Sequence, residues 1–172
     1  MKALKLSLIA ILACAALVSC KKKDETADET AQKKAEYVEF LTNKKGWVLE
    51  SATSSPAYEL LDGSYATNLM TEGYLEECEL DEVIKFAENG GLTVNPGDDV
   101  CDGETEYAAT WSLSEDLNYL SFQIPFFYDN ELEKCQILSL TKDQLRVKFT
   151  FDDFESGAKT KYSFTITYKI NK

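Results

Sequence analysis

The second half of the chain alternates between apolar and polar residues with a period of two. Successive side chains of a β-strand point to opposite faces, so each alternating run would place one apolar face against a core. This rhythm predicts a domain built mostly from half-buried antiparallel strands. The apolar positions of the four clearest runs are Tyr107, Ala109, Trp111 and Leu113; Leu120, Phe122, Ile124 and Phe126; Leu145, Val147, Phe149 and Phe151; and Tyr162, Phe164, Ile166, Tyr168 and Ile170.

About eight strands with short connectors are predicted from Gly46 onward. Tight sequential links suit hairpins, and eight hairpin-linked strands can close into a small antiparallel up-and-down barrel that has no exposed edges. A two-sheet sandwich would show the same alternation, but its long Greek-key crossovers are not evident. We expect residues 53–78 to form a long ordered loop with room for one short strand or helical turn. The predicted strands cover residues 46–52, 82–87, 91–95, 106–114, 118–125, 133–140, 145–151 and 159–169.

Residues 1–19 are predicted to be a lipoprotein signal peptide. Lys2 and Lys5 precede a short apolar core, and small residues precede the expected cut. The segment Leu17-Val18-Ser19-Cys20 is typical of a bacterial lipobox, in which Cys20 becomes the acylated first residue. The alternative, a transmembrane helix, would need roughly 20 apolar residues. We therefore expect attachment to a membrane of the cell envelope through an N-terminal lipid, such as palmitate, with more than one acyl chain for a stable anchor.

The segment that follows Cys20 is predicted to be a tether. Residues 20–32 are polar, so they are expected to be flexible, and residues 33–172 would form the folded domain. Within the tether, Lys23-Asp24-Glu25 resembles an export signal that places Bacteroidota lipoproteins on the outer face of the outer membrane; the alternative is a generic charged spacer. Apolar residues at helical spacing predict a short helix from about Lys33 to Thr42, with a glycine stop at Gly46.

The charge and the missing histidine limit the function classes. The mature chain would carry 16 basic and 30 acidic side chains, a net charge of −14, because the removed segment holds two of the 18 basic residues and no acid. Such a chain repels phosphate backbones, so no nucleic-acid binding is expected. Without histidine the chain lacks the commonest general base and metal ligand. We expect no enzymatic activity, no catalytic residue and no cofactor.

Two local motifs are interpreted as chance matches. Ser156-Gly157-Ala158-Lys159 has the spacing of a serine–lysine nucleophile, but its companion motifs are missing. The acidic run 98–104 resembles a calcium loop, but Val100 occupies a position that requires an acid. A solvated acidic turn explains the run better, so no metal site is expected.

Five cysteines divide by position. Cys14 leaves with the signal peptide and Cys20 carries lipid, so Cys78, Cys101 and Cys135 remain in an oxidising compartment, where three pairings are possible. Cys78 and Cys101 lie in polar, turn-rich surroundings, whereas Cys135 lies in a strand-like run. This difference favours a Cys78–Cys101 disulfide and a buried free thiol at Cys135.

Several motifs occur in an order that resembles a known family. They are Lys45-Gly46-Trp47-Val48-Leu49, Glu77 to Phe86, Leu92 to Gly97 before Cys101, Trp111-Ser112-Leu113, Tyr119-Leu120 and Ile137 to Thr141. From about Lys45 to its end, the chain resembles the uncharacterised lipocalin-like lipoproteins of Bacteroidota. The resemblance implies a lipid-tethered, eight-stranded barrel of the lipocalin or calycin type, with a disulfide between Cys78 and Cys101.

Two functions are consistent with such a barrel. Its interior is either filled by side chains or holds a small ligand. In the first case the protein acts through its surface, as a protein-interaction module such as an accessory subunit, an inhibitor or a host-contact protein. Residues 124–128 are then the best patch, and we expect Phe127 to be exposed or to cover the barrel mouth. In the second case the barrel binds a small hydrophobic ligand; the candidate ligand-binding residues are Trp47, Trp111, Phe122, Phe149, Tyr162 and Phe164.

Overall fold

The computed structural model describes residues 18–101, 103, 105–127, 132–153 and 160–172, with the backbone only for residues 18–27. The chain divides into two compact units, Met1–Tyr37 and Val38–Lys172. Most of the predicted signal peptide lies outside the described residues, and so do the side chain of Cys20, residue 128 of the predicted patch and the serine–lysine motif at 156–159. Lipidation at Cys20 therefore stays a prediction.

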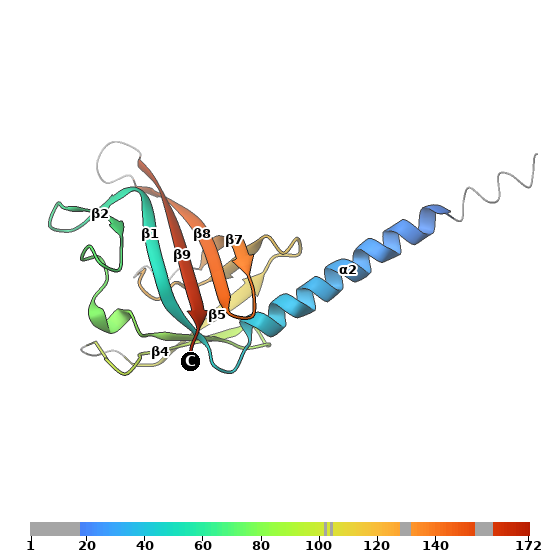
Figure 1. The fold of residues 1–172 in the computed structure, drawn as a ribbon, viewed down its shortest axis with the longest axis horizontal. Coiled ribbons are helices and arrows are strands. Elements are labelled where there is room, and N and C mark those ends of the chain that lie inside the picture. The colour runs from blue at the N-terminus through green and yellow to red at the C-terminus, as the bar shows by residue number, and fades with distance from the viewer. Residues whose placement is uncertain (1–17, 102, 104, 128–131, 154–159) are drawn as a thin grey trace, which may run out of the picture. The chain divides into compact units, whose positions relative to one another are not determined.

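The second unit is a closed antiparallel barrel, as predicted (Figure 1). Each strand pairs with the next one around the ring, and β1 also pairs with β9 from Trp47↔Ile170 to Ser55↔Ser163. This last pairing closes the ring and excludes the sandwich. The eight barrel strands of the described chain are β1 (Trp47–Glu59), β3 (Val83–Phe86), β4 (Gly91–Asn95), β5 (Tyr107–Leu113), β6 (Tyr119–Phe122), β7 (Glu133–Leu140), β8 (Gln144–Asp153) and β9 (Thr160–Ile170).

The first strand is longer than predicted. β1 continues to Glu59, and a short strand, β2 (Tyr65–Asn68), pairs with its far half. Residues 53–59 are mostly small and polar, so their alternation is weak, but β9 on one side and β2 on the other satisfy their backbone groups. A 3-10 turn, η1 (Glu77–Glu79), follows. The stretch expected as one loop therefore holds a hairpin and a helical turn.

The N-terminal helix also differs from the prediction. α2 spans Val18–Leu41, so the segment expected as a flexible tether is helical. The physical reason is composition, because this span has no glycine or proline and is rich in alanine, lysine and glutamate, which favour helices. Pairs four residues apart add support: the Lys33 ammonium lies 5.3 Å from the centre of the Tyr37 ring. No helix among the described residues is long and apolar enough to cross a membrane.

Candidate binding site at one end of the barrel

The strand directions give the barrel two different ends. Three described connections lie at one end, which we call the loop end: residues 60–82, the segment between β4 and β5, and the segment between β6 and β7. The opposite end, which we call the turn end, holds the turns at 87–90, 114–118 and 141–143 and the start of β1. The loop end lies at the left of Figure 1, where the β1–β2 hairpin is labelled by β2.

Aromatic rings fill the barrel in two clusters. Toward the turn end, Phe86 packs against Trp111 and Phe122 with ring centres 5.5 and 5.7 Å apart. Toward the loop end, Phe149 and Phe164 stack with ring centres 5.0 Å apart. Contacts of this kind stabilise a packed core beyond the apolar area that they bury. The interior is therefore occupied largely by side chains.

All six residues predicted to line a ligand site are buried in this core. Trp47 is fully buried at the turn end and donates its indole N–H to the Leu41 carbonyl at 2.9 Å. Trp111 donates in the same way to the Ala87 carbonyl at 2.9 Å. Both tryptophans are thereby fixed as structural residues. The other four divide between the two clusters: Phe122 belongs to the first, and Phe149, Tyr162 and Phe164 to the second.

Phe127 covers the ring cluster at the loop end. Its side chain is half-buried, and its ring centre lies 5.0 and 5.1 Å from those of Phe149 and Phe164. This position agrees with the prediction of a ring over the barrel mouth. The wider patch predicted at 124–128 is wrong, because Ile124 and Phe126 are buried. β6 ends at Phe122, and both side chains belong to the turn that follows, in which the Phe127 amide donates to the Ile124 carbonyl at 3.1 Å.

The exposed apolar side chains gather elsewhere on the loop end. Of the six large hydrophobic residues that are exposed in the described chain, five belong to this end and Leu138 on β7 does not. Phe151 is one of them: it was expected to face inward, but it lies near the end of β8 and is 43% exposed. The other four are Leu61, Tyr65, Val100 and Leu132.

A groove opens beside the β1–β2 hairpin. It has a volume of about 500 Å³, within the range of ligand pockets, roughly 300–1,000 Å³. Tyr58 connects it to the barrel core, because the Tyr58 ring centre lies 5.0 Å from that of Tyr162 and 5.5 Å from that of Phe164. The lining residues are Tyr58, Glu59, Leu60, Leu61, Asp62, Ser64, Glu72, Gly73 and Tyr74. The sequence interpretation missed this groove, because it treated the hairpin as part of a loop.

Residues 41–147 match the family model of the lipocalin-like domain. This chain belongs to the lipocalin-like domain family. No curated protein matches it. Among solved structures it is similar to a bovine odorant-binding protein deswapped triple mutant (11% identity, 76% of this chain and 73% of that chain covered, TM-score 0.40). It is also similar to bovine odorant-binding protein in complex with a selenium-containing odorant (12% identity, 77% and 71% covered, TM-score 0.41).

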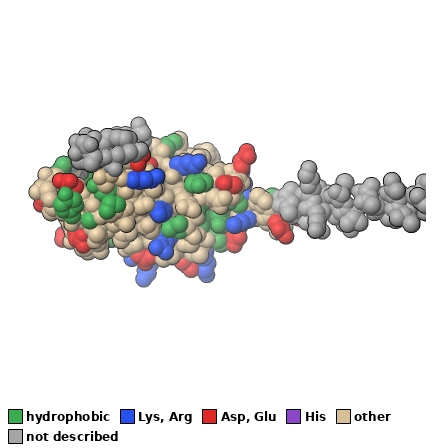
Figure 2. Space-filling model, turned by 90° about the horizontal axis from the view of Figure 1, so that it is seen from above, with side chains coloured by type: hydrophobic (Ala, Val, Ile, Leu, Met, Phe, Trp, Pro, Cys, Tyr) green, Lys and Arg blue, Asp and Glu red, His purple; other side chains and the backbone are tan. Residues whose placement is uncertain are grey.

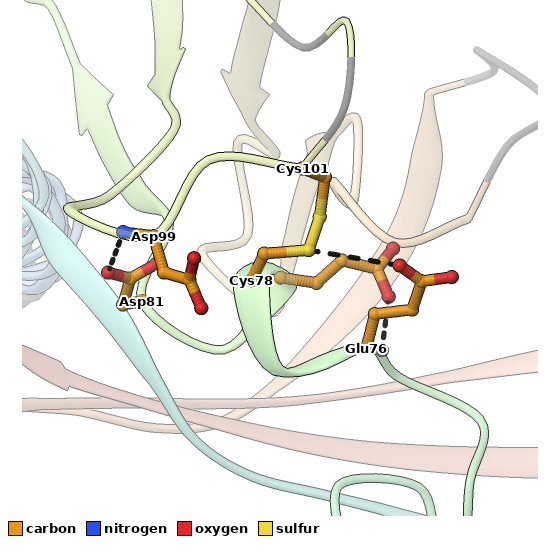
Figure 3. The surroundings of a disulfide bond; sticks show 6 residues. Glu76, Cys78, Asp81, Asp99 and Cys101 are labelled. Carbon is orange, nitrogen blue, oxygen red and sulfur yellow. Dashed lines mark hydrogen bonds between the residues drawn. A yellow bond between two sulfur atoms is a disulfide. The ribbon is translucent and has the colours of Figure 1, made fainter.

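A disulfide joins two connections of this lipocalin-like domain. Cys78 and Cys101 are bonded, as predicted, with their Cα atoms 5.3 Å apart (Figure 3). The bond ties η1 to the segment between β4 and β5 at the loop end. Next to it, a carboxylate oxygen of Asp81 accepts hydrogen bonds from the amides of Asp98 and Asp99 at 2.7 and 3.1 Å. Gly97 is needed there, because a Cβ atom would collide with the Asp81 carboxylate.

Two cysteine-containing places were candidates for chemistry: Cys135 and the surroundings of the disulfide. Cys135 is a buried free thiol, as predicted, and burial raises the pKa of its thiol far above the usual value. Glu76 lies close to Cys78 and Cys101, and these three form a group with the side-chain types of a metal site in the described chain. The disulfide occupies both sulfur atoms, so the group lacks the thiolates that a metal would need.

Two carboxylates at the groove are fixed by hydrogen bonds. Asp62 accepts from the Ser64 hydroxyl at 2.6 Å and from the Ser64 amide at 2.9 Å, and these bonds lower the pKa of Asp62. The amides of Thr67 and Asn68 donate to Glu72 at 2.6 and 3.3 Å and lower its pKa. Both groups are therefore anionic at neutral pH.

The hydroxyl of Tyr168 lies inside the barrel. Tyr168 is 2% exposed, and its hydroxyl has no hydrogen bond among the described residues. Its ring packs against Phe122, with ring centres 6.2 Å apart. Burial raises the pKa of Tyr168, so the hydroxyl stays neutral and can donate a hydrogen bond.

Proposed function

We propose that this protein is a non-enzymatic, lipid-anchored binding protein of the cell envelope that takes up a small hydrophobic ligand at the loop end of its barrel. The observation that carries the proposal is the groove of about 500 Å³ beside the β1–β2 hairpin. Pockets of this size with apolar walls and a few polar groups are typical of small-molecule sites. The missing histidine and the packed interior support binding rather than catalysis.

Lipid anchoring is the second part of the proposal. It rests on the lipobox Leu17-Val18-Ser19-Cys20 and the apolar segment before it. Mass spectrometry of the protein from its native membrane tests it: we expect a mature chain that begins at an acylated Cys20. A chain that still begins at Met1 would contradict this part and leave the ligand proposal intact.

Ligand binding can be tested with a pair of variants that remove one exposed leucine each. Leu61→Gln changes the groove, whereas Leu138→Gln changes β7 outside it, and neither side chain contributes to the core because both are exposed. We expect a neutral fluorescent probe such as N-phenyl-1-naphthylamine to bind the unaltered protein and the Leu138→Gln variant equally. Leu61→Gln should weaken binding severalfold. Equal binding by all three proteins would contradict the site.

A protein-interaction module is the second candidate function. The specific observation in its favour is the gathering of exposed apolar side chains at the loop end, because exposed apolar residues that cluster mark interaction sites. A photo-crosslinking residue placed at Leu132 or at Leu138 in the native host separates the two functions. A protein adduct specific to position 132 favours the interaction module, and its absence favours the small ligand.

A further inference from the structure

We infer that the groove beside the β1–β2 hairpin takes a cationic amphiphile, a small molecule with an ammonium group on an apolar body. The inference rests on the proposed binding function and names the chemical class of its ligand. It follows from two properties of the same groove: apolar walls and an anionic rim without any basic side chain.

The apolar walls come from the two sides of the groove. Leu60 and Leu61 belong to the hairpin, and Tyr74 faces them from the segment after β2. A backbone hydrogen bond closes the turn of the hairpin: the Leu60 amide donates to the Ser64 carbonyl at 2.8 Å. Gly73 has a φ of +85°, which favours glycine, and a Cβ there would point at Leu60 from 4.0 Å. Glycine is favoured at this position by the backbone conformation, because a Cβ would make only an ordinary van der Waals contact with Leu60.

The anionic rim consists of Glu59, Asp62 and Glu72. Asp62 and Glu72 are held by backbone amides, so they keep their positions and their charge whether or not a ligand is bound. A carboxylate can accept about four hydrogen bonds in all, so each of these two still has acceptor capacity for an ammonium group. Tyr58 and Tyr74 add aromatic walls, and aromatic faces attract cations.

Among the described residues that line this groove, none carries a positive charge that would repel a cationic ligand. The lining contains no lysine or arginine, and the sequence has none between Lys45 and Lys85. Residues 46–133, which contain every described lining residue, carry 20 acidic side chains and one lysine, so the segment that forms the groove is strongly negative. Figure 2 agrees: acidic and hydrophobic side chains lie side by side at the left end, and the visible basic ones lie further right. An anionic amphiphile would be repelled.

Three ligands with the same alkyl chain test the inference: n-octylamine, 1-octanol and octanoate. Isothermal titration calorimetry at pH 7 would use the full chain with Cys20→Ala, which cannot be acylated. We expect octylamine to bind about three- to tenfold more tightly than octanol, as suits one ammonium beside exposed carboxylates, and octanoate to bind most weakly. The preference should shrink as salt is added, because the carboxylates are exposed.

Variants that remove the charges of the rim test whether these carboxylates cause the preference for octylamine. Asp62→Asn with Glu72→Gln keeps the acceptors for the backbone amides, so the hairpin should stay folded. We expect this double variant to lose most of its preference for octylamine. The matched control, Glu88→Gln with Glu115→Gln, removes two charges at the turn end and should keep the preference.

The outcomes separate this inference from the proposed function. Equal affinity for octylamine and octanol would overturn the cationic class, and a preference that survives Asp62→Asn with Glu72→Gln would overturn its assignment to the carboxylates of this groove. Either result leaves hydrophobic binding standing. If none of the three ligands binds, the proposed function itself fails at this groove. Octanoate as the tightest ligand would contradict the charge argument directly.

Discussion

Removal of the Cys78–Cys101 disulfide should lower the stability of the barrel domain by an amount that the loop length sets. The perturbation is the double variant Cys78→Ser, Cys101→Ser. The bond closes a loop with a sequence separation of 23, and the chain-entropy model gives about 3 kcal/mol for a loop of this size. Spread over a domain of this length, such a loss corresponds to about 10 °C in Tm.

The loss of stability should come almost entirely from a change in the unfolded state. η1 and the segment between β4 and β5 also hold each other through Asp81, which accepts bonds from Asp98 and Asp99. These contacts stay in the double variant, so the folded barrel should keep its near-native strand pairing. Only the unfolded chain gains freedom when the loop is opened. Amide exchange should therefore increase at the loop end and change little in β8 and β9, which pair over ten residue pairs.

The assay is urea unfolding followed by tryptophan fluorescence, with Trp47 and Trp111 as buried reporters. The unaltered protein in dithiothreitol should match the double variant, and dithiothreitol should not affect the variant itself. A stability loss below about 1 kcal/mol would refute the reasoning, because the entropy that the unfolded chain gains when the loop is opened should lower the free energy of unfolding by more than that. A loss accompanied by disrupted β8 and β9 would show instead that the bond is needed to form the barrel.

Four further outcomes follow from single side chains. Gly46→Ala should destabilise the domain by about 2 kcal/mol or more in the same urea assay, because φ is +80° and a Cβ would meet the Val83 side chain at 2.7 Å. Tyr168→Phe should raise the unfolding free energy by about 1 kcal/mol or leave it unchanged, because it removes a buried hydroxyl that has no hydrogen bond within the described part of the chain; a clear loss of stability would reveal a partner. Cys135 should stay unreactive toward a thiol reagent at pH 8 until urea unfolds the barrel, since burial raises its pKa. Hydrogen bonds lower the pKa of Glu72 in the folded state, so its stabilising contribution is complete above its unfolded pKa and is lost as the pH falls through its folded pKa. Between about pH 5 and 3, the free energy of unfolding should therefore fall more for the unaltered protein than for Glu72→Gln.

The strands could be predicted from the sequence where apolar side chains alternate along one face. β9 is the clearest case: five apolar residues alternate with polar ones, and the predicted span 159–169 differs from the observed span 160–170 by one residue at each end. β1 shows the limit of this signal. Its far half, residues 53–59, has few apolar residues and contains Pro56, which indicates an interruption. Its strand conformation depends on β9 and β2, which lie far away or follow later in the sequence.

The helix was predicted too short for a related reason. An apolar stripe indicates where a helix packs, but helix propensity alone extends α2 through residues that have no such stripe. The groove is harder still to predict, because it forms only when Gly73 and Tyr74 return to the hairpin. Its one sequence signal is the dipeptide Asp62-Gly63 between two strand-like segments, which is a turn signal and suggests a hairpin rather than a loop.

The aromatic rows show why a correct face assignment does not by itself identify a ligand site. Alternation places Phe149 and Phe164 on the inner face, and the structure confirms that both are buried. Whether inward rings line a cavity or fill it depends on their separation across the barrel, and strand periodicity contains no information about that distance. Here rings from non-adjacent strands meet, because the ring centre of Phe122 on β6 lies 5.7 Å from that of Phe86 on β3 and 6.2 Å from that of Tyr168 on β9, so the space that an empty barrel would offer is occupied at this level. The proposed site therefore lies outside the barrel interior, at the hairpin, where the exposed Leu61 and the fixed carboxylates of Asp62 and Glu72 line one groove, and where a substitution would leave the core intact.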